Sequence, residues 1–110
     1  MTAMESAPHH PVVLIDEIQV QPGGVVSKVV ARADTGSLTL FAFDGGEGLD
    51  EHSTPSTAMV LVLEGTLRIR LGGEDHTVAQ GEMLALPPGK PHAVRAPEPA
   101  KMLLVLFKAP

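Results

Sequence analysis

The sequence predicts an all-β domain, a sandwich or barrel of short antiparallel strands. Glycine and proline account for 11 and 10 of the 110 residues, and they interrupt the apolar segments so often that little room remains for a helix of three turns. In residues 66–71, apolar side chains alternate with two arginines, which is the period of a strand with one face in the core and one in water. Gly72-Gly73 follows directly and predicts a two-residue hairpin turn, because both central residues need a positive φ.

The expected strands follow one another with turn signals between them. The first apolar segment ends at Gln21-Pro22-Gly23-Gly24 and the second at Asp34-Thr35-Gly36. In such turns glycine supplies a positive φ, and proline restricts the backbone conformation of the residue next to it. Residues 44–48 are too rich in glycine to form a strand. The predicted strands cover residues 12–20, 25–33, 37–43, 57–63, 66–71, 74–79, 82–86, 92–96 and 102–108.

Length and charge limit the class of protein. The chain is long enough for one domain, which we place at residues 12–110 behind a flexible leader at 1–11. Its 13 acidic and 8 basic residues give a net charge of -5, which disfavours nucleic acids and anionic membranes as partners. No cysteine is present for disulfides or thiolate sites, and no stretch reaches the roughly 20 apolar residues of a membrane helix. We expect a cytoplasmic protein that binds a small molecule or another protein.

One histidine lies in a frame of spaced glycines in the middle of the chain. Gly46, His52 and Gly65 have the spacing of the first motif of the cupins, a family of small jelly-roll barrels that this segment resembles. In that motif a His-x-His pair follows the first glycine after five residues, and a glutamate comes three or four residues later. Here Thr54 stands at the second histidine and Ala58 at the glutamate.

A second histidine lies in a frame that resembles the second cupin motif. That motif has a glycine, five residues, Pro-x-Gly, two residues, a histidine and usually an asparagine four residues later. The corresponding residues are Gly81, Pro87, Gly89, His92 and Ala96. Because so many glycines, prolines and histidines agree in one frame, the resemblance implies an antiparallel jelly-roll barrel, the double-stranded β-helix of cupins.

The same resemblance implies an incomplete metal site. Metal-binding cupins hold a divalent ion with three histidines and a glutamate, and only His52 and His92 match that set. Thr54 offers a neutral hydroxyl and Ala58 no ligand atom at all, whereas catalytic zinc sites typically use three protein ligands. We therefore expect either one weakly held divalent metal ion at this pair or no metal, with the two rings bonded to each other, to Thr54 or to water.

Other residues are expected near that cavity. In an extended segment residues 52, 54, 56 and 58 share a face, and Asp50 has the same parity, which makes it a candidate substitute carboxylate. Pro55 argues for an irregular backbone at this point. The predicted auxiliary or cavity-lining residues are Thr54, Ala58, Asp50, Met59 and Met83.

The remaining polar residues have simpler interpretations. His9 and His10 belong to the leader, and His76 is expected at the surface. Arg68 and Arg70 are expected on the solvent face of their strand. The chain has no Trp or Tyr and three Phe, so the cavity should be aliphatic and suit a small, partly apolar molecule.

Two functional hypotheses remain, and the sequence leaves open whether the protein is an enzyme. The first is a non-enzymatic cupin that binds a small ligand in the cavity at His52 and His92. The alternative is a mononuclear metal-dependent enzyme of dioxygenase, isomerase or lyase type that acts on a small organic substrate. In either case we expect a homodimer, because apolar residues predominate in residues 25–31 and 102–107.

Overall fold

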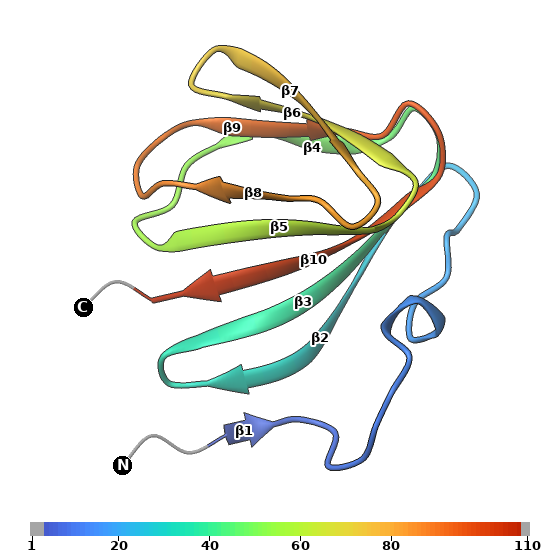
Figure 1. Cartoon of the computed structure of the whole chain (residues 1–110), viewed down its shortest axis with the longest axis vertical. Helices are drawn as coiled ribbons and strands as arrows, with labels where there is room; N and C mark the ends of the chain where they lie inside the picture. The colour runs from blue at the N-terminus through green and yellow to red at the C-terminus, as the bar shows by residue number, and fades with distance from the viewer. Residues whose placement is uncertain (1–3, 109–110) are drawn as a thin grey trace.

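The computed structural model describes residues 4–108 and is built almost entirely of β-strands (Figure 1). Its elements are β1 (Met4–Ser6), the 3₁₀ helix η1 (Leu14–Asp16), β2 (Val25–Ala33), β3 (Gly36–Phe43), β4 (Gly48–His52), β5 (Thr57–Glu64), β6 (Thr66–Leu71), β7 (Glu74–Ala79), β8 (Met83–Leu86), β9 (His92–Arg95) and β10 (Ala100–Phe107). Among the residues described, no helix is long and apolar enough to cross a membrane.

The strands form two antiparallel sheets. The six-stranded sheet has the order β1-β2-β3-β10-β5-β8, and the four-stranded sheet has the order β4-β9-β6-β7. In Figure 1 the four-stranded sheet lies above the β8 end of the larger one. This arrangement confirms the predicted all-β jelly roll.

The main core lies between the two sheets. Alternate residues of β5 and β6 point into it, so that Val60, Val62, Leu67 and Ile69 are fully buried in one cluster that joins both sheets. The alternation predicted for residues 66–71 is confirmed, since Leu67, Ile69 and Leu71 are buried while the residues between them are exposed.

A second apolar cluster covers part of the outer face of the six-stranded sheet. Ile18 packs there with Leu40 and Leu103. Lys101 holds the covering segment in place, since its Nζ donates a hydrogen bond of 2.7 Å to the backbone carbonyl of Ile15. The N-terminal segment is therefore part of the folded domain from η1 onward (Figure 1).

The prediction of a strand at residues 12–20 is wrong. These residues form η1 and irregular backbone instead. Their buried and partly buried apolar residues include Leu14, Ile18 and Val20, but the exposed Asp16 stands between the first two, where an alternating strand would place an apolar side chain. The segment instead uses these side chains to cover the outer face of the six-stranded sheet.

Two further segments differ from the expectation. β4 was not predicted, because glycines precede it and Pro55 follows it, yet it pairs with β9. Within the expected leader, β1 pairs with β2, with Met4 opposite Ala33. Residues 1–3 of that leader and residues 109–110 of the expected domain lie outside the described residues.

Candidate functional site

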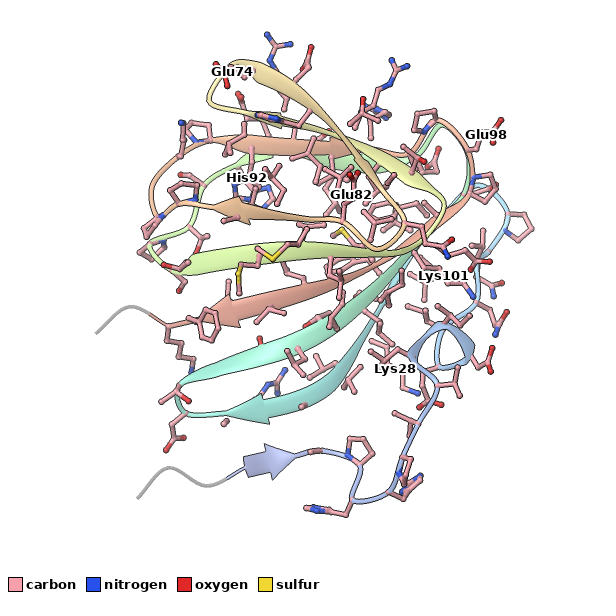
Figure 2. All side chains as sticks on the ribbon, in the orientation of Figure 1. Lys28, Glu74, Glu82, His92, Glu98 and Lys101 are labelled. Carbon is pink, nitrogen blue, oxygen red and sulfur yellow. The ribbon has the colours of Figure 1, made fainter. Side chains whose placement is uncertain are left out.

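Two histidines meet on the inner side of the four-stranded sheet. His52 ends β4 and His92 begins β9, and the two residues are direct cross-strand partners. Their Nε2 atoms lie 3.2 Å apart, and the ring centroids are 4.3 Å apart at an angle of 68°. Figure 2 shows His92 between the two sheets. The structure thus brings together the two histidines that the motifs singled out.

The backbone fixes the orientation of both rings. The Nδ1 of His52 bonds the carbonyl of Asp50 at 2.9 Å, and the Nδ1 of His92 bonds the carbonyl of Lys90 at 3.2 Å. Because a carbonyl only accepts hydrogen bonds, each Nδ1 carries the proton. Each Nε2 of a neutral ring is then a bare acceptor.

One arrangement that satisfies two bare acceptors facing each other is a cation between them. A divalent metal about 2.0–2.1 Å from each nitrogen, at a tetrahedral or octahedral angle, separates two ligand nitrogens by about 2.9–3.4 Å. The 3.2 Å between the Nε2 atoms falls in this interval. A proton shared by the two rings satisfies the same distance. The donor chemistry of the pair therefore fits one small cation.

The two rings differ in their access to water. His92 is 4% exposed, whereas His52 is exposed. Burial lowers the pKa of His92, the charge of His52 lowers it further, and the hydrogen bond to the Lys90 carbonyl opposes both effects. Burial therefore favours the neutral imidazole of His92, the form whose lone pair is available. A ligand would approach from the side of His52.

The third and fourth ligand positions of the motif carry no substitute donor. The Oγ1 of Thr54 accepts a hydrogen bond of 3.2 Å from the backbone of Ser56. Ala58 is buried in β5, in the opposite sheet. Among the side chains that the structure describes, no group of three or more from His, Cys, Asp or Glu is placed to hold a metal. Among the described residues, this pair therefore offers a cation two imidazole nitrogens.

The shared face predicted for residues 52–58 does not apply. β4 ends at His52, and the chain crosses to the other sheet before β5 begins at Thr57. The alternation of side chains between two faces does not continue through this irregular crossing, which contains Pro55. The carbonyl of Thr54 instead accepts a hydrogen bond from Gly89, which joins the two motif loops.

Asp50 contributes differently from the prediction. It is exposed, and its backbone carbonyl, not its carboxylate, contacts His52. Lys90, which the sequence did not single out, has the same role for His92. The available signal was local, since each of these carbonyls lies two residues before its histidine.

Met59 and Met83 do not line this site. Met59 alternates with the inward residues Ala58 and Val60, and Met83 lies opposite Leu61. Leu61 belongs to the outer cluster, so both methionines lie on the outer face of the six-stranded sheet. Their prediction as cavity-lining residues is wrong, because sequence alone did not show which parity of β5 faced inward.

The other histidines lie elsewhere. His9 and His10 are exposed. His76 is half-buried on β7, with its Nε2 3.7 Å from Oε2 of Glu74. β7 and β4 form opposite edges of the four-stranded sheet, so His76 is no part of the pair.

Comparison with known proteins settles the family. A model of the cupin domain matches residues 39–106, more than half of the chain and the span that holds both histidines. The chain belongs to the cupin family. No curated protein matches this cupin closely enough to suggest its activity.

Several solved structures resemble this cupin. One is a conserved protein of unknown function from Streptococcus pyogenes, with 32% identity and a TM-score of 0.89 over 100% of this chain and 97% of that one. Another is a cupin 2 conserved barrel domain protein from Leptotrichia buccalis, with 37% identity and a TM-score of 0.82 over 86% of this chain and 46% of that longer one. A cupin superfamily protein from Desulfitobacterium hafniense, with 24% identity and a TM-score of 0.88 over 97% of this chain and 99% of that one, supports the fold alone.

Proposed function

We propose that this cupin binds a small organic ligand at a divalent metal ion held by His52 and His92. The observation that supports the proposal is the orientation of the two rings. Each Nδ1 is held by a backbone carbonyl, and the two Nε2 atoms face each other at 3.2 Å. A neutral pair in this arrangement offers two lone pairs to one cation.

The donor set also indicates the kind of ligand. Two neutral imidazoles leave the charge of a divalent ion uncompensated, and they leave most coordination positions to water and to the ligand. Such an ion polarises bound oxygen atoms and favours anionic ones. Leu71, the cross-strand partner of His92, is buried in the core. We therefore favour a small molecule with a carboxylate or enol oxygen and an apolar remainder.

Metal analysis of protein without a purification tag tests the site. We expect about one divalent ion per chain in the wild type and its loss in His52→Ala and in His92→Ala. Isothermal titration with Ni²⁺ should show the same loss. The double variant His9→Ala/His10→Ala is the matched control, because it removes two exposed imidazoles that lie outside the pair; its Ni²⁺ binding at the pair should be unchanged. Unchanged metal content in both single variants would refute the proposal.

An enzyme of dioxygenase, isomerase or lyase type is the second candidate. The observation that favours it is the small number of protein ligands, because open positions on a metal are where substrate or oxygen binds. Turnover of a small carboxylate or enol substrate by the metal-loaded protein, abolished in His92→Ala, would select this function. Binding of the same compound without turnover would select the non-enzymatic function.

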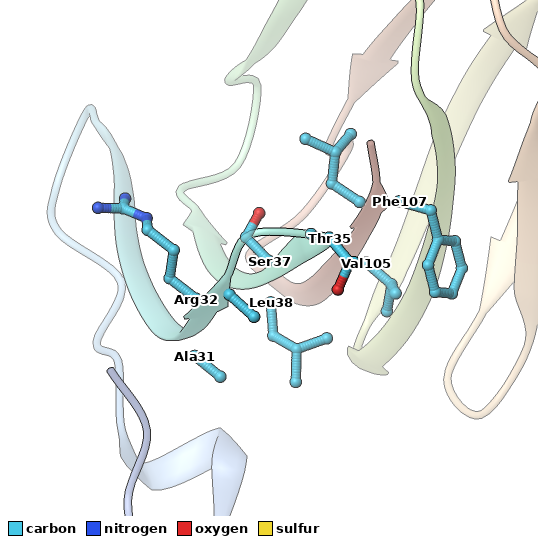
Figure 3. A pocket seen from close by; sticks show the side chains of 10 residues that line it. Ala31, Arg32, Thr35, Ser37, Leu38, Val105 and Phe107 are labelled. Carbon is cyan, nitrogen blue, oxygen red and sulfur yellow. The ribbon is translucent and has the colours of Figure 1, made fainter. Parts of the chain in front are cut away.

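We also propose that the protein forms a homodimer through the outer face of its six-stranded sheet. Met83 and Phe107 are 55% and 49% exposed there. A hollow of about 190 Å³ near the end of β10 is lined by Leu38, Val105 and Phe107, among others (Figure 3). One sheet packed on its symmetry mate would cover these side chains.

Light scattering after size exclusion tests the dimer. We expect twice the chain mass for the wild type at micromolar concentration and a monomer for Phe107→Glu, since the charge would be buried without a partner. Glu47→Gln, in the loop between β3 and β4 and outside the strands of this sheet, is the control and should remain dimeric. A monomeric wild type would refute the proposal.

A further inference from the structure

The outward face of the four-stranded sheet gathers three arginines. Arg68 and Arg70 lie on β6, and Arg95 lies on β9 directly opposite Arg68. Together with Asp75 and other neighbours they line an open hollow of about 390 Å³. The whole chain has only 8 lysines and arginines and a net charge of -5. The positive charge gathered on this face therefore contrasts with the net negative charge of the chain.

The cluster is poorly compensated by the protein itself. Like charges directly opposite each other destabilise an antiparallel pair. Arg70 lies 3.9 Å from Asp75, and the two side chains are 58% and 77% exposed, which makes a weak ion pair. Arg95 donates to the backbone carbonyl of Gly46 at 3.1 Å, a neutral acceptor. Arg68, Arg70 and Arg95 against Asp75 therefore leave two more positive than negative charges along the hollow.

The strand register sets the spacing of these groups. Arg68 has Arg95 on one side and Thr77 on the other, and Arg70 has Ala93 and Asp75. Directly opposite residues are about 4.5–5.5 Å apart at Cβ, and next-but-one residues along a strand about 6.5 Å. Arginine side chains are longer than these separations, so the three guanidinium groups can contact one ligand. The small side chain of Ala93 leaves room between Arg70 and Arg95.

We propose that this hollow binds a compact polyvalent oxyanion, a phosphate or diphosphate group. Guanidinium groups form paired hydrogen bonds with phosphate oxygens, and they bind planar or tetrahedral oxyanions better than lysine does. The hydroxyl of Thr77 adds a donor beside Arg68. An anion in this position removes the repulsion between Arg68 and Arg95. Three arginines form a binding site of the size of one small anion, whether that anion is free or is the phosphate group of an organic molecule.

The site is independent of the histidine pair. Arg68 and Arg70 point outward, whereas the alternate residues Ile69 and Leu71 point into the core. The two sites therefore lie on opposite faces of the same sheet. Loss of metal at His52 and His92 should leave the anion site intact, and failure of one proposal leaves the other standing.

Thermal unfolding with pyrophosphate and inorganic phosphate tests the site. We expect millimolar pyrophosphate to raise the melting temperature of the wild type, by preferential binding to the folded state. Arg68→Gln and Arg70→Gln should each weaken the affinity about tenfold or more by titration calorimetry. Arg32→Gln, an exposed arginine of the other sheet, is the matched control and should behave as the wild type does.

The apparent stability without ligand gives a second readout. Arg68→Gln removes a like-charge neighbour of Arg95, so the anion-free variant should melt at the same temperature as the wild type or higher. Three outcomes would overturn the proposal: no response of the wild type to millimolar pyrophosphate, an equal response in Arg68→Gln and Arg70→Gln, or an equal response to sodium chloride at matched ionic strength. A phosphate ester that binds more tightly than free phosphate would identify the source as an organic ligand, and equal binding would identify it as the free anion.

Discussion

The Nε2 of His52 lies 3.2 Å from the Nε2 of His92, although forty residues separate the two histidines in the chain. Backbone carbonyls hold both Nδ1 atoms, so the Nε2 atoms, which carry no proton in the neutral rings, face each other. The proposed cation site rests on this relationship, and several measurable properties depend on it.

The metal-free protein should lose stability in acid through His92. Burial holds the pKa of His92 below its ordinary value of 6.5, so between the folded and the unfolded pKa the unfolded chain binds more protons. The free energy of unfolding should therefore fall as the pH drops below about 6.5 and level off below the folded pKa. Urea unfolding with a chelator, at several pH values, measures this. His92→Gln should show a smaller acid loss, and an identical pH profile in the variant would contradict the assignment.

A third imidazole should strengthen metal binding. Thr54→His restores a histidine at the second position of the first motif, where the loop already contacts Gly89. We expect metal affinity to rise by about tenfold or more, because three-ligand sites hold metals better than two-ligand ones. The loss of the Thr54–Ser56 hydrogen bond should cost about 0.5–1.5 kcal/mol of stability. Titration calorimetry with Ni²⁺ checks the gain, and unchanged affinity would show that residue 54 lies out of reach.

The fourth motif position should not tolerate restoration. Ala58 is 2% exposed within the main core, so Ala58→Glu buries a carboxylate among apolar side chains. We expect a loss of several kcal/mol in the metal-free protein, measured by urea unfolding. Ala58→Val, which keeps the site apolar, should cost less than Ala58→Glu. Equal stabilities of the two variants would show that a carboxylate at this position is solvated or paired.

Lys101 should control the N-terminal segment. It is 9% exposed, and its ammonium group bonds the Ile15 carbonyl at 2.7 Å and lies 3.5 Å from Glu64. Lys101→Ala leaves that carbonyl without its donor and should cost about 1–3 kcal/mol. Hydrogen exchange should accelerate around η1 more than in β6. Lys108→Ala, at an exposed position, is the control, and equal effects of the two substitutions would refute this role.

Two motif glycines should differ in their tolerance of a side chain. Gly46 and Gly65 both have positive φ, at 86° and 79°, which costs a residue other than glycine about 1–2 kcal/mol. A Cβ at Gly46 meets no atom within 4 Å, whereas at Gly65 it would lie 2.7 Å from the Pro99 carbonyl oxygen. Denaturant unfolding of Gly46→Ala and Gly65→Ala should therefore show the larger loss for Gly65→Ala. Equal losses would mean that the backbone near Pro99 shifts to make room for the added Cβ at little cost in free energy.

Local chemistry made some of the fold predictable. The hairpin at Gly72-Gly73 is confirmed, with φ values of 56° and 88° and Leu71 opposite Glu74. The alternation in β6 is confirmed as well. β4 could not be predicted, because its residues Gly48–His52 lack an apolar pattern and are ordered by pairing with β9. Residues 12–20 were predicted as a strand from composition, although their place is decided by the apolar surface that they cover.

The candidate site was predictable in identity but not in arrangement. Motif spacing singled out His52 and His92. Met59 and Met83 were misplaced because the sequence shows that side chains alternate between two faces of a strand but not which of the two faces is buried.

By itself, the sequence determined the strand periodicity, most of the turns, the two histidines and the absence of a histidine and a glutamate at residues 54 and 58. These are local properties of backbone conformation and side-chain chemistry. Only the tertiary structure decided that His52 and His92 meet through Nε2, that Ala58 lies in the opposite sheet, and that Arg68 lies opposite Arg95. Such contacts depend on sheet order and strand register, which are set by the packing of the whole chain around its core.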